Sequence, residues 1–448
     1  MALDCLPEVL TTTHTAAAIT APGVVHASNP RSAPAFRSLP PVVRESHGGR
    51  RNERRALRSA SRSPLMRKDY LVFGQPLLEQ PEIDEVVACM RSAWLGTGPK
   101  VAEFEKLIAA YKGVPHALAL NSCTAGLHLA CLVLGLQPGD EVITTPMTFC
   151  ASINAIVHAG AVPVLADVDP TTMNLDPAQV RARITKRTKA ILPVHFAGRS
   201  CDMGALMAIA KEHGLKVIED CAHAIETEYR GKKAGTMGDL GVLSFYSTKN
   251  IVTGEGGMVL TRDAALARRT KVLGLHGMSA DAWKRFSDDG YRHYDVEEIG
   301  FKYNMMDLQA AIGLHQITRV EAWWQRRWQV WQRYMKEFAD LPIGLPAVWP
   351  GDERHALHLF TLQVEEARCG VSRDAMLMRL HKQNIGTGVH YRSVPSLSVY
   401  QRKFGWKAGD WPVAKAIGER TVSIPLSAKL SDGDVGDVIA AVRGALRG

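Results

Sequence analysis

The stretch Val217-Ile218-Glu219-Asp220 is a short apolar run that ends in a carboxylate, and Lys249 follows 29 positions after Asp220. Lys249 stands within Ser244-Phe245-Tyr246-Ser247-Thr248-Lys249-Asn250, and the glycine-rich turn 254–257 comes next. Pyridoxal phosphate (PLP) needs an acid partner that keeps its ring nitrogen protonated and a lysine that forms a Schiff base with its aldehyde. The pairing therefore predicts a PLP site with Lys249 and Asp220 as its catalytic residues.

Each of these two residues also has an ordinary structural interpretation. A lysine is usually exposed, but apolar residues precede Lys249, and an apolar pocket lowers the pKa of an amine toward the neutral, nucleophilic form. Asp220 could instead cap a helix after a strand. Glu219 is the competing carboxylate, but side chains alternate along a strand, which puts Glu219 on the opposite face.

Further residues are candidates for contacts to the cofactor. The segment 121–126 ends a strand and opens a helix, and free N–H groups at a helix N-terminus bind phosphate. Phe149, at another strand end, can stack on a pyridine ring, and His223 can hydrogen-bond the phenolic oxygen. The predicted cofactor-binding residues are Lys249, Asp220, His223, Thr124, Ala125, Phe149 and Ser244.

Short apolar runs alternate with helical patterns from about residue 100 onward. Strands are predicted at 117–120, 141–144, 162–166, 189–194 and 216–219, with helices between them. Such alternation predicts an α/β fold with a mostly parallel sheet, whose chemistry gathers at the carboxyl ends of the strands. One long helix is predicted over 307–325, and a strand over 388–391.

Composition and charge narrow the class of protein. The chain has 448 residues and a net charge of +9, of which 9 − 4 = +5 comes from residues 1–65. That segment is predicted to be a disordered basic tail that lies upstream of the true start, and its Arg- and Ser-rich, acid-poor composition also resembles a transit peptide. No apolar run is long enough to span a bilayer, no basic stripe indicates nucleic-acid binding, and no Cys spacing indicates a metal site. We expect a cytoplasmic enzyme.

Together these segments resemble the DegT/DnrJ/EryC1/StrS family of fold-type I aminotransferases, which act on nucleotide-linked keto sugars. The resemblance runs from about Phe73 to the C-terminus. It rests on 97–99, 122–126, 139–143, 168–169, 218–224, 244–250, 255–257, 300–304 and 386–390. It implies a PLP-dependent transferase of fold type I, with a mostly parallel seven-stranded sheet in a large domain (66–330) and a smaller C-terminal α+β domain (331–448).

The resemblance also implies a function and partners. The chain is expected to move an amino group from L-glutamate to a nucleotide-linked 4-keto sugar, as a homodimer in which Asn304 reaches the neighbouring active site. Segments 194–198, 369–375 and 386–392 resemble members that aminate UDP-4-keto-arabinose for lipid A modification of lipopolysaccharide. Substrate binding is assigned to His195, His390 and Arg392, although a surface salt bridge is the alternative for Arg392.

Three other functions compete with this prediction. One is transamination of another 4-keto-6-deoxyhexose nucleotide or a cyclitol. A pyridoxamine-dependent sugar dehydratase would be expected to carry histidine where this chain has Lys249. A non-catalytic regulator of the same fold would be expected to lose Lys249 or Asp220, and both are present.

Overall fold

The central sheet forms from the short apolar runs that the sequence pattern predicts. The computed structural model describes residues 67–279 and 294–447, all within one unit that runs from Arg62 to Gly448. The predicted tail, residues 1–65, lies outside the described residues. The strands of the sheet are β1 (His116–Leu120), β2 (Glu141–Thr144), β3 (Val162–Leu165), β4 (Thr188–Leu192), β5 (Lys216–Cys221), β8 (Leu240–Ser244) and β9 (Gly257–Thr261).

The strand order places β5 near the middle of this sheet. The order is β1-β9-β8-β5-β4-β2-β3. Pairing is parallel from β8 through β5, β4, β2 and β3, while β9 runs antiparallel to both of its neighbours. This confirms the predicted α/β class and the mostly parallel seven-stranded sheet. The carboxyl end of β5, where Asp220 stands, therefore lies between two parallel neighbours, which is where ligands bind in such sheets.

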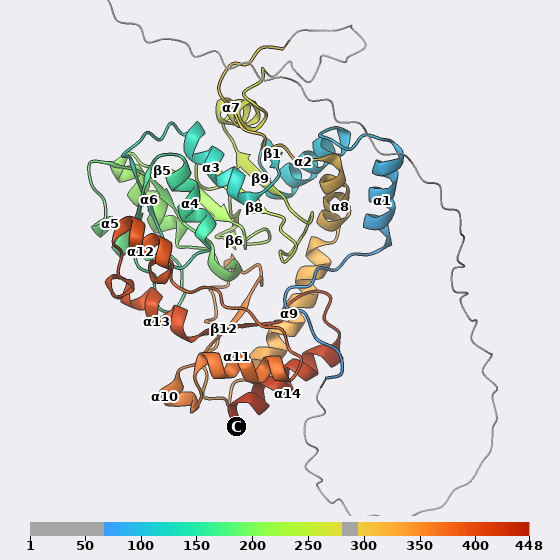
Figure 1. Ribbon diagram of the computed structural model, residues 1–448, viewed down its shortest axis with the longest axis vertical. Helices are drawn as coiled ribbons and strands as arrows, with labels where there is room; N and C mark the ends of the chain where they lie inside the picture. Colours follow the sequence, from blue (N-terminus) through green and yellow to red (C-terminus); the bar gives the residue numbers. More distant parts are fainter. Residues whose placement is uncertain (1–66, 280–293, 448) are drawn as a thin grey trace, which may run out of the picture. The chain divides into compact units, whose positions relative to one another are not determined.

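Helices cover both faces of the sheet (Figure 1). They are α2 (Pro99–Lys112), α3 (Cys123–Val133), α4 (Cys150–His158), α5 (Pro177–Ala182), α6 (Met203–His213), α7 (Ala264–Gly274) and α8 (Asp307–Thr318), while α1 (Gln80–Arg91) packs against α8. Alternate residues of β5 enter different cores: Ile218 packs in the cluster that contains α3 and α4, whereas Val217 packs with α6. Asp220 shares the face of Ile218, so it points toward α3 and α4.

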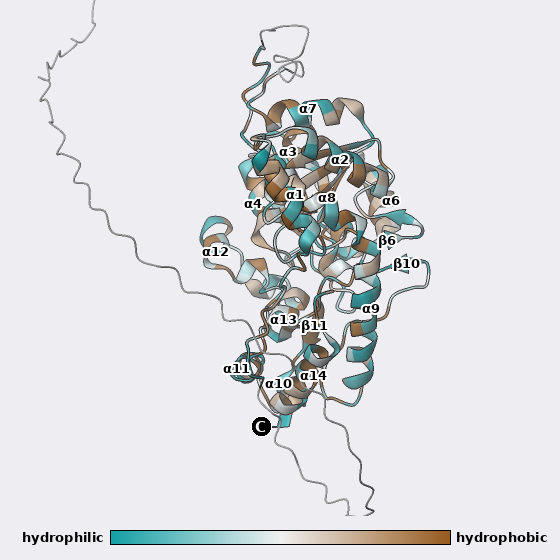
Figure 2. Ribbon diagram, turned by 90° about the vertical axis from the view of Figure 1, so that its right-hand side faces the viewer, coloured by the Kyte–Doolittle hydropathy of each residue, from teal (hydrophilic) through white to brown (hydrophobic). Residues whose placement is uncertain are grey.

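Helix α9 (Val320–Glu337) leads from the large sheet into a second core. That core contains β11 (Phe360–Gln363) and β12 (Thr421–Ile424), which pair antiparallel, and it includes Leu71 from the start of the described chain. Around it lie α10 (Glu366–Cys369), α11 (Arg373–Lys382) and α14 (Asp432–Arg447), whereas α12 (Ser398–Phe404) and α13 (Pro412–Arg420) pack in a separate cluster with α4 and β3. Much of α9 and α11 is hydrophilic, in contrast to β11 (Figure 2). A small sheet of β6 (Glu228–Tyr229), β7 (Lys232–Lys233) and β10 (Glu353–Arg354) joins the two parts.

Two predicted elements are wrong. The single helix over 307–325 is divided at Arg319: α8 ends at Thr318, α9 begins at Val320, and the guanidinium group of Arg319 pairs with Glu79 and Glu82 at the start of α1. The predicted strand over 388–391 is only one bridge, between Gly388 and Ser423. Among the described residues, no helix is both long and apolar enough to cross a membrane.

Candidate active site

A cavity of about 500 Å³ lies at the carboxyl end of β5. Its lining comes from widely separated parts of the chain: the start of α3, the start of α4, the ends of β5 and β8, the turn around Gly256, and the segments around His358 and His390. Lys249 and Asp220 both line it. The structure therefore brings the two predicted catalytic residues to a single pocket.

Asp220 is buried, and each of its carboxylate oxygens is held by one donor. Oδ2 accepts from Ser152 Oγ at 2.8 Å, and Oδ1 accepts from the amide of Ala222 at 3.0 Å. Since the carboxylate can only accept, Ser152 donates its hydroxyl proton to Asp220. Thr148 Oγ1 lies 2.8 Å from Ser152 Oγ and is therefore the donor of the Thr148–Ser152 hydrogen bond. Burial raises the pKa of Asp220, while the bonds from Ala222 and Ser152 and the charge of Lys249 oppose that rise. Both oxygens keep a free lone pair for a protonated ring nitrogen.

Lys249 lies in a tight turn after β8, where its amide donates to the carbonyl of Tyr246 at 2.8 Å. Burial lowers the pKa of its amine to about 8, although the nearby Cys123 thiol and Asp220 carboxylate act in the opposite direction. A lysine with that pKa is partly neutral at physiological pH, which an amine needs in order to attack an aldehyde.

The N-terminus of α3 forms another wall of the cavity. Ser122 caps the helix by accepting from the amide of Ala125 at 3.1 Å. Ser122, Cys123, Thr124 and Ser244 line the cavity, and the N–H groups of the first helical turn have no intrahelical acceptor. Gly257 of β9 passes so close that a Cβ there would lie 2.4 Å from the amide nitrogen of Cys123. This helix start can therefore receive a phosphate.

Aromatic and imidazole rings complete the cavity. The Phe149 side chain is 59% exposed, and its ring lies 6.1 Å from that of Tyr391. His223 Nδ1 accepts from the amide of Ala197 at 3.2 Å, so in neutral His223 the proton is on Nε2 and is donated to the Tyr391 hydroxyl at 3.0 Å. Burial, then the charge of Lys249, lowers the pKa of His223 well below its usual range. His390 lines the cavity too, with a pKa that burial lowers to about 4.

Four predicted site residues do not line this cavity. The amide of Ala125 is occupied by Ser122, as described above. Arg392 is exposed, and its guanidinium group donates to the carbonyl of Ser396. Asn304 donates from Nδ2 to Thr97 Oγ1 at 2.5 Å, and its buried Oδ1 has no partner among the described residues.

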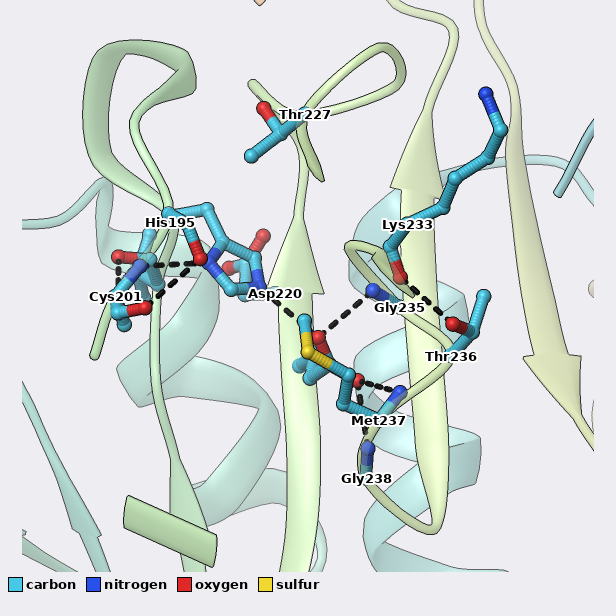
Figure 3. A network of polar contacts seen from close by, with 12 residues as sticks. His195, Cys201, Asp220, Thr227, Lys233, Gly235, Thr236, Met237 and Gly238 are labelled. Carbon is cyan, nitrogen blue, oxygen red and sulfur yellow. Dashed lines mark hydrogen bonds and ion pairs between the residues drawn. The ribbon is translucent and has the colours of Figure 1, made fainter. Parts of the chain in front are cut away.

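The fourth of these residues, His195, is fully buried behind Asp220 rather than open to a substrate. Its Nδ1 accepts from the amide of Cys201 at 3.1 Å, so its Nε2 proton is donated to Glu219 at 3.1 Å. In this position its side chain has no surface exposed to a substrate. Its own amide donates to the carbonyl of Asp220, which ties β4 to β5 at the site (Figure 3).

Glu219 takes the opposite face of β5 from Asp220. Besides the proton of His195, it accepts from the amides of Gly235, Met237 and Gly238 at 2.7–2.8 Å, in the loop drawn in Figure 3. Burial raises the pKa of Glu219, but the interaction with His195 and the bonds from Gly238 and Gly235 outweigh it and leave the pKa below its ordinary value. Cys221 lies close to His195 and Glu219. A metal would need a lone pair on Nε2 of His195, but that nitrogen carries the proton that it donates to Glu219. Glu219 is a structural carboxylate.

The residues present fit pyridoxal phosphate. An anion-binding helix start, a buried amine and a hydrogen-bonded carboxylate line the same cavity, and they match the phosphate, the aldehyde and the ring nitrogen in turn. Lys249 would hold the aldehyde end, Asp220 the ring nitrogen, and Thr124 with Ser244 the phosphate.

Comparison with known proteins identifies the family. Residues 76–443 match the DegT/DnrJ/EryC1/StrS aminotransferase family. The chain belongs to this family. It is 49% identical to the spore coat polysaccharide biosynthesis protein SpsC of Bacillus subtilis over 383 residues, 85% of this chain and 98% of SpsC.

Solved structures agree with the family assignment. Spr1654 of Streptococcus pneumoniae, solved in a PLP form, is 32% identical with a TM-score of 0.78, over 84% of this chain and 99% of that one. PseC of Helicobacter pylori, an aminotransferase of pseudoaminic acid biosynthesis, is 28% identical with a TM-score of 0.78, over 85% and 100%. The chain is a PLP-dependent sugar aminotransferase, which confirms the predicted cofactor, fold type and class of enzyme.

Several residues of the cavity were not predicted from the sequence. Ser152 holds Asp220 and is itself bonded to Thr148, Tyr391 receives the proton of His223, and the His358 ring is tilted against His223 with ring centroids 4.4 Å apart. Ser152 stands three positions after Phe149, which is one helical turn, so helical spacing could have indicated it. Nothing in the local sequence around His358 distinguishes it from a core histidine.

Proposed function

We propose that this aminotransferase moves the amino group of L-glutamate to the keto carbon of a nucleotide-linked 4-keto sugar. The observation that carries the proposal is that Lys249 and Asp220 line one cavity together with the N-terminus of α3. The family and its relatives support a sugar as the amino acceptor.

The residues of the cavity divide the chemistry among them. Pyridoxal phosphate, when bound, supplies an aldehyde that an amine can attack and a ring that accepts the electrons of a broken C–H bond. Asp220 holds a proton at the ring nitrogen. Lys249 would take the proton from the Cα of the amino donor as general base and later return a proton as general acid. Its pKa of about 8 suits both tasks.

The name of SpsC favours a sugar that enters a polysaccharide. SpsC belongs to spore coat polysaccharide biosynthesis and PseC to pseudoaminic acid biosynthesis. UDP-4-keto-arabinose, and with it lipid A modification, remains one candidate for this chain, and 4-keto-6-deoxyhexose nucleotides are the others. His390 is the proposed contact to an anionic part of the substrate. It lines the cavity, and its Nδ1 atom contacts Ser423 Oγ, which leaves the Nε2 atom for the substrate.

We also propose a homodimer with shared active sites. Among the residues that line the cavity, Lys249 is the sole lysine or arginine, whereas a phosphate and a dicarboxylic donor bring several negative charges. A second subunit can supply the missing cations, and Asn304, with its unpartnered Oδ1, is positioned outside its own cavity. On α1 and just beyond it, Ile83, Val87, Met90 and Trp94 are exposed at helical spacing, and such an apolar stripe marks an interface.

The dimer is tested by Met90→Asp. Met90 is 62% exposed on α1, and Met378, 57% exposed on α11, is the matched control. Sedimentation should show that Met90→Asp shifts the protein to monomers and lowers its activity, whereas Met378→Asp leaves both unchanged. Monomers with full activity would rule out shared sites.

The substrate is tested with a panel of keto sugar nucleotides. The purified protein, PLP and L-glutamate are incubated with UDP-4-keto-arabinose and with 4-keto-6-deoxyhexose nucleotides, and amino sugar is measured by mass spectrometry. At least one nucleotide sugar should gain an amino group. Conversion of free keto sugars alone would refute the proposal.

A further inference from the structure

Four residues connect α9 to the cavity by consecutive contacts. Arg327 of α9 and Glu226, with side-chain exposures of 3% and 0%, form an ion pair through Nη2 and Oε1. The other oxygen of Glu226 accepts from Asn250 Nδ2 at 2.8 Å, and Asn250 Oδ1 lies 2.9 Å from His358 Nδ1. Asn250 directly follows Lys249, and His358 lines the cavity.

These contacts determine where His358 carries its proton. Asn250 Nδ2 faces two groups that can only accept, the Glu226 carboxylate and the carbonyl of Ala356 at 2.9 Å. The amide nitrogen must therefore point toward Glu226, and the amide oxygen toward His358. Since an amide oxygen only accepts, Nδ1 of His358 is the donor, and Nε2 of the neutral ring is a bare lone pair.

The Nε2 atom of His358 is the ring nitrogen left for a ligand. Asn250 occupies the Nδ1 atom, and within residues 67–279 and 294–447 no hydrogen bond to Nε2 is found. The ring lies 4.4 Å from that of His223, which has the opposite tautomer and uses both of its nitrogens, on the Ala197 amide and the Tyr391 hydroxyl, so Nε2 of His358 is the imidazole nitrogen that this pair offers to a ligand. Burial, then the charge of Lys249, keeps the pKa of His358 well below its usual range, so the ring stays neutral.

We propose that His358 Nε2 accepts a hydrogen bond from an N–H or O–H group of a substrate, and that Asn250 and Glu226 are positioning residues that hold the ring in this orientation. The substrate role rests on the proposed function. The group is either the ammonium of the amino donor or a hydroxyl of the sugar, and the two half-reactions separate these sources.

Two substitutions of His358 separate a substrate contact from a structural one. In His358→Asn the side-chain amide can still donate to Asn250, but the acceptor at the Nε2 position is gone. In His358→Gln an amide oxygen can reach that position. Each half-reaction is followed in single turnovers by the absorbance of the bound cofactor, one with L-glutamate and one with the keto sugar nucleotide.

His358→Asn should lower kcat/KM by about fivefold or more, the usual effect of one lost hydrogen bond to a ligand, in the half-reaction whose substrate carries the donor group. His358→Gln should recover most of it. Loss with glutamate identifies the ammonium, and loss with the sugar identifies a hydroxyl. Unchanged rates, or an equal loss in both half-reactions with no recovery in His358→Gln, would overturn the proposal.

The proton position is tested without any substrate or cofactor. Solid-state NMR of cofactor-free protein labelled with ¹⁵N-histidine should show His358, assigned by its disappearance in His358→Asn, protonated at Nδ1. Asn250→Ala should abolish that preference, whereas Thr270→Val, which removes a hydroxyl bond within α7, should not. Protonation at Nε2 in the unaltered protein would overturn the inference. Failure of every sugar in the panel would instead count against the proposed function.

Discussion

The lowered pKa of Lys249 predicts how fast the cofactor-free protein captures PLP at each pH. With a pKa of about 8, about one amine in ten is neutral at pH 7, compared with about one in three thousand for an ordinary lysine of pKa near 10.5. Only the neutral amine attacks an aldehyde. Lys249 should therefore react about 300-fold faster at pH 7 than an exposed lysine of equal access.

The assay follows the visible absorbance of the new Schiff base after PLP is mixed with cofactor-free protein between pH 6.5 and 9.5. The capture rate should rise about tenfold per pH unit and level off above pH 8, because burial lowers the pKa. Asp220→Asn removes a charge that raises this pKa, so the plateau should begin at a lower pH. A rate that still climbs at pH 9.5 would refute the reasoning.

Three further predictions concern the framework of the site. Gly257→Ala should weaken cofactor retention on gel filtration, because its Cβ would lie 2.4 Å from the Cys123 amide nitrogen, whereas Gly409→Ala, with no atom within 4 Å, should retain PLP normally. Ser152→Ala removes a bond that favours ionised Asp220, so the acid limb of the pH–rate profile should move to higher pH; an unmoved limb would exclude this role. Glu219→Ala should destabilise the protein by about 2–4 kcal/mol at pH 7, since it leaves buried donors unpaired. The folded-state pKa of Glu219 is lowered, so its stabilisation is present above pH 4.5 and is lost as pH falls through that lower pKa. Thermal unfolding should therefore show the two proteins converging in strong acid, and equal melting temperatures at pH 7 would contradict this role.

The catalytic pair could be predicted because its signal is local. Short segments of sequence contain both signals: an apolar strand that ends at Asp220, and an apolar strand followed by Lys249 and a glycine-rich turn. Adjacent parallel strands then bring their carboxyl ends together. The same alternation assigned Glu219 to the other face of β5, which is where its four hydrogen bonds hold it.

The rest of the site depends on contacts between distant segments. His195 follows β4 as Asp220 ends β5, but its side chain turns inward to Glu219, a choice that only the packed structure reveals. His358 is oriented by a hydrogen bond to Asn250, 108 positions earlier in the sequence. Arg327 of α9 belongs to the same series of contacts through its ion pair with Glu226. Arg319, at the break between α8 and α9, likewise pairs with Glu79 and Glu82, about 240 positions away.

The central claim is that Lys249 is the amine that holds the cofactor. Borohydride reduction of the PLP-loaded protein, followed by proteolysis and mass spectrometry, tests it most directly. The cofactor should be fixed to the peptide that contains Lys249, and Lys249→Ala should remove both the label and transamination, whereas Lys271→Ala, at an exposed position of α7, should keep both. A reduced cofactor attached to any other lysine of the unaltered protein would contradict the account.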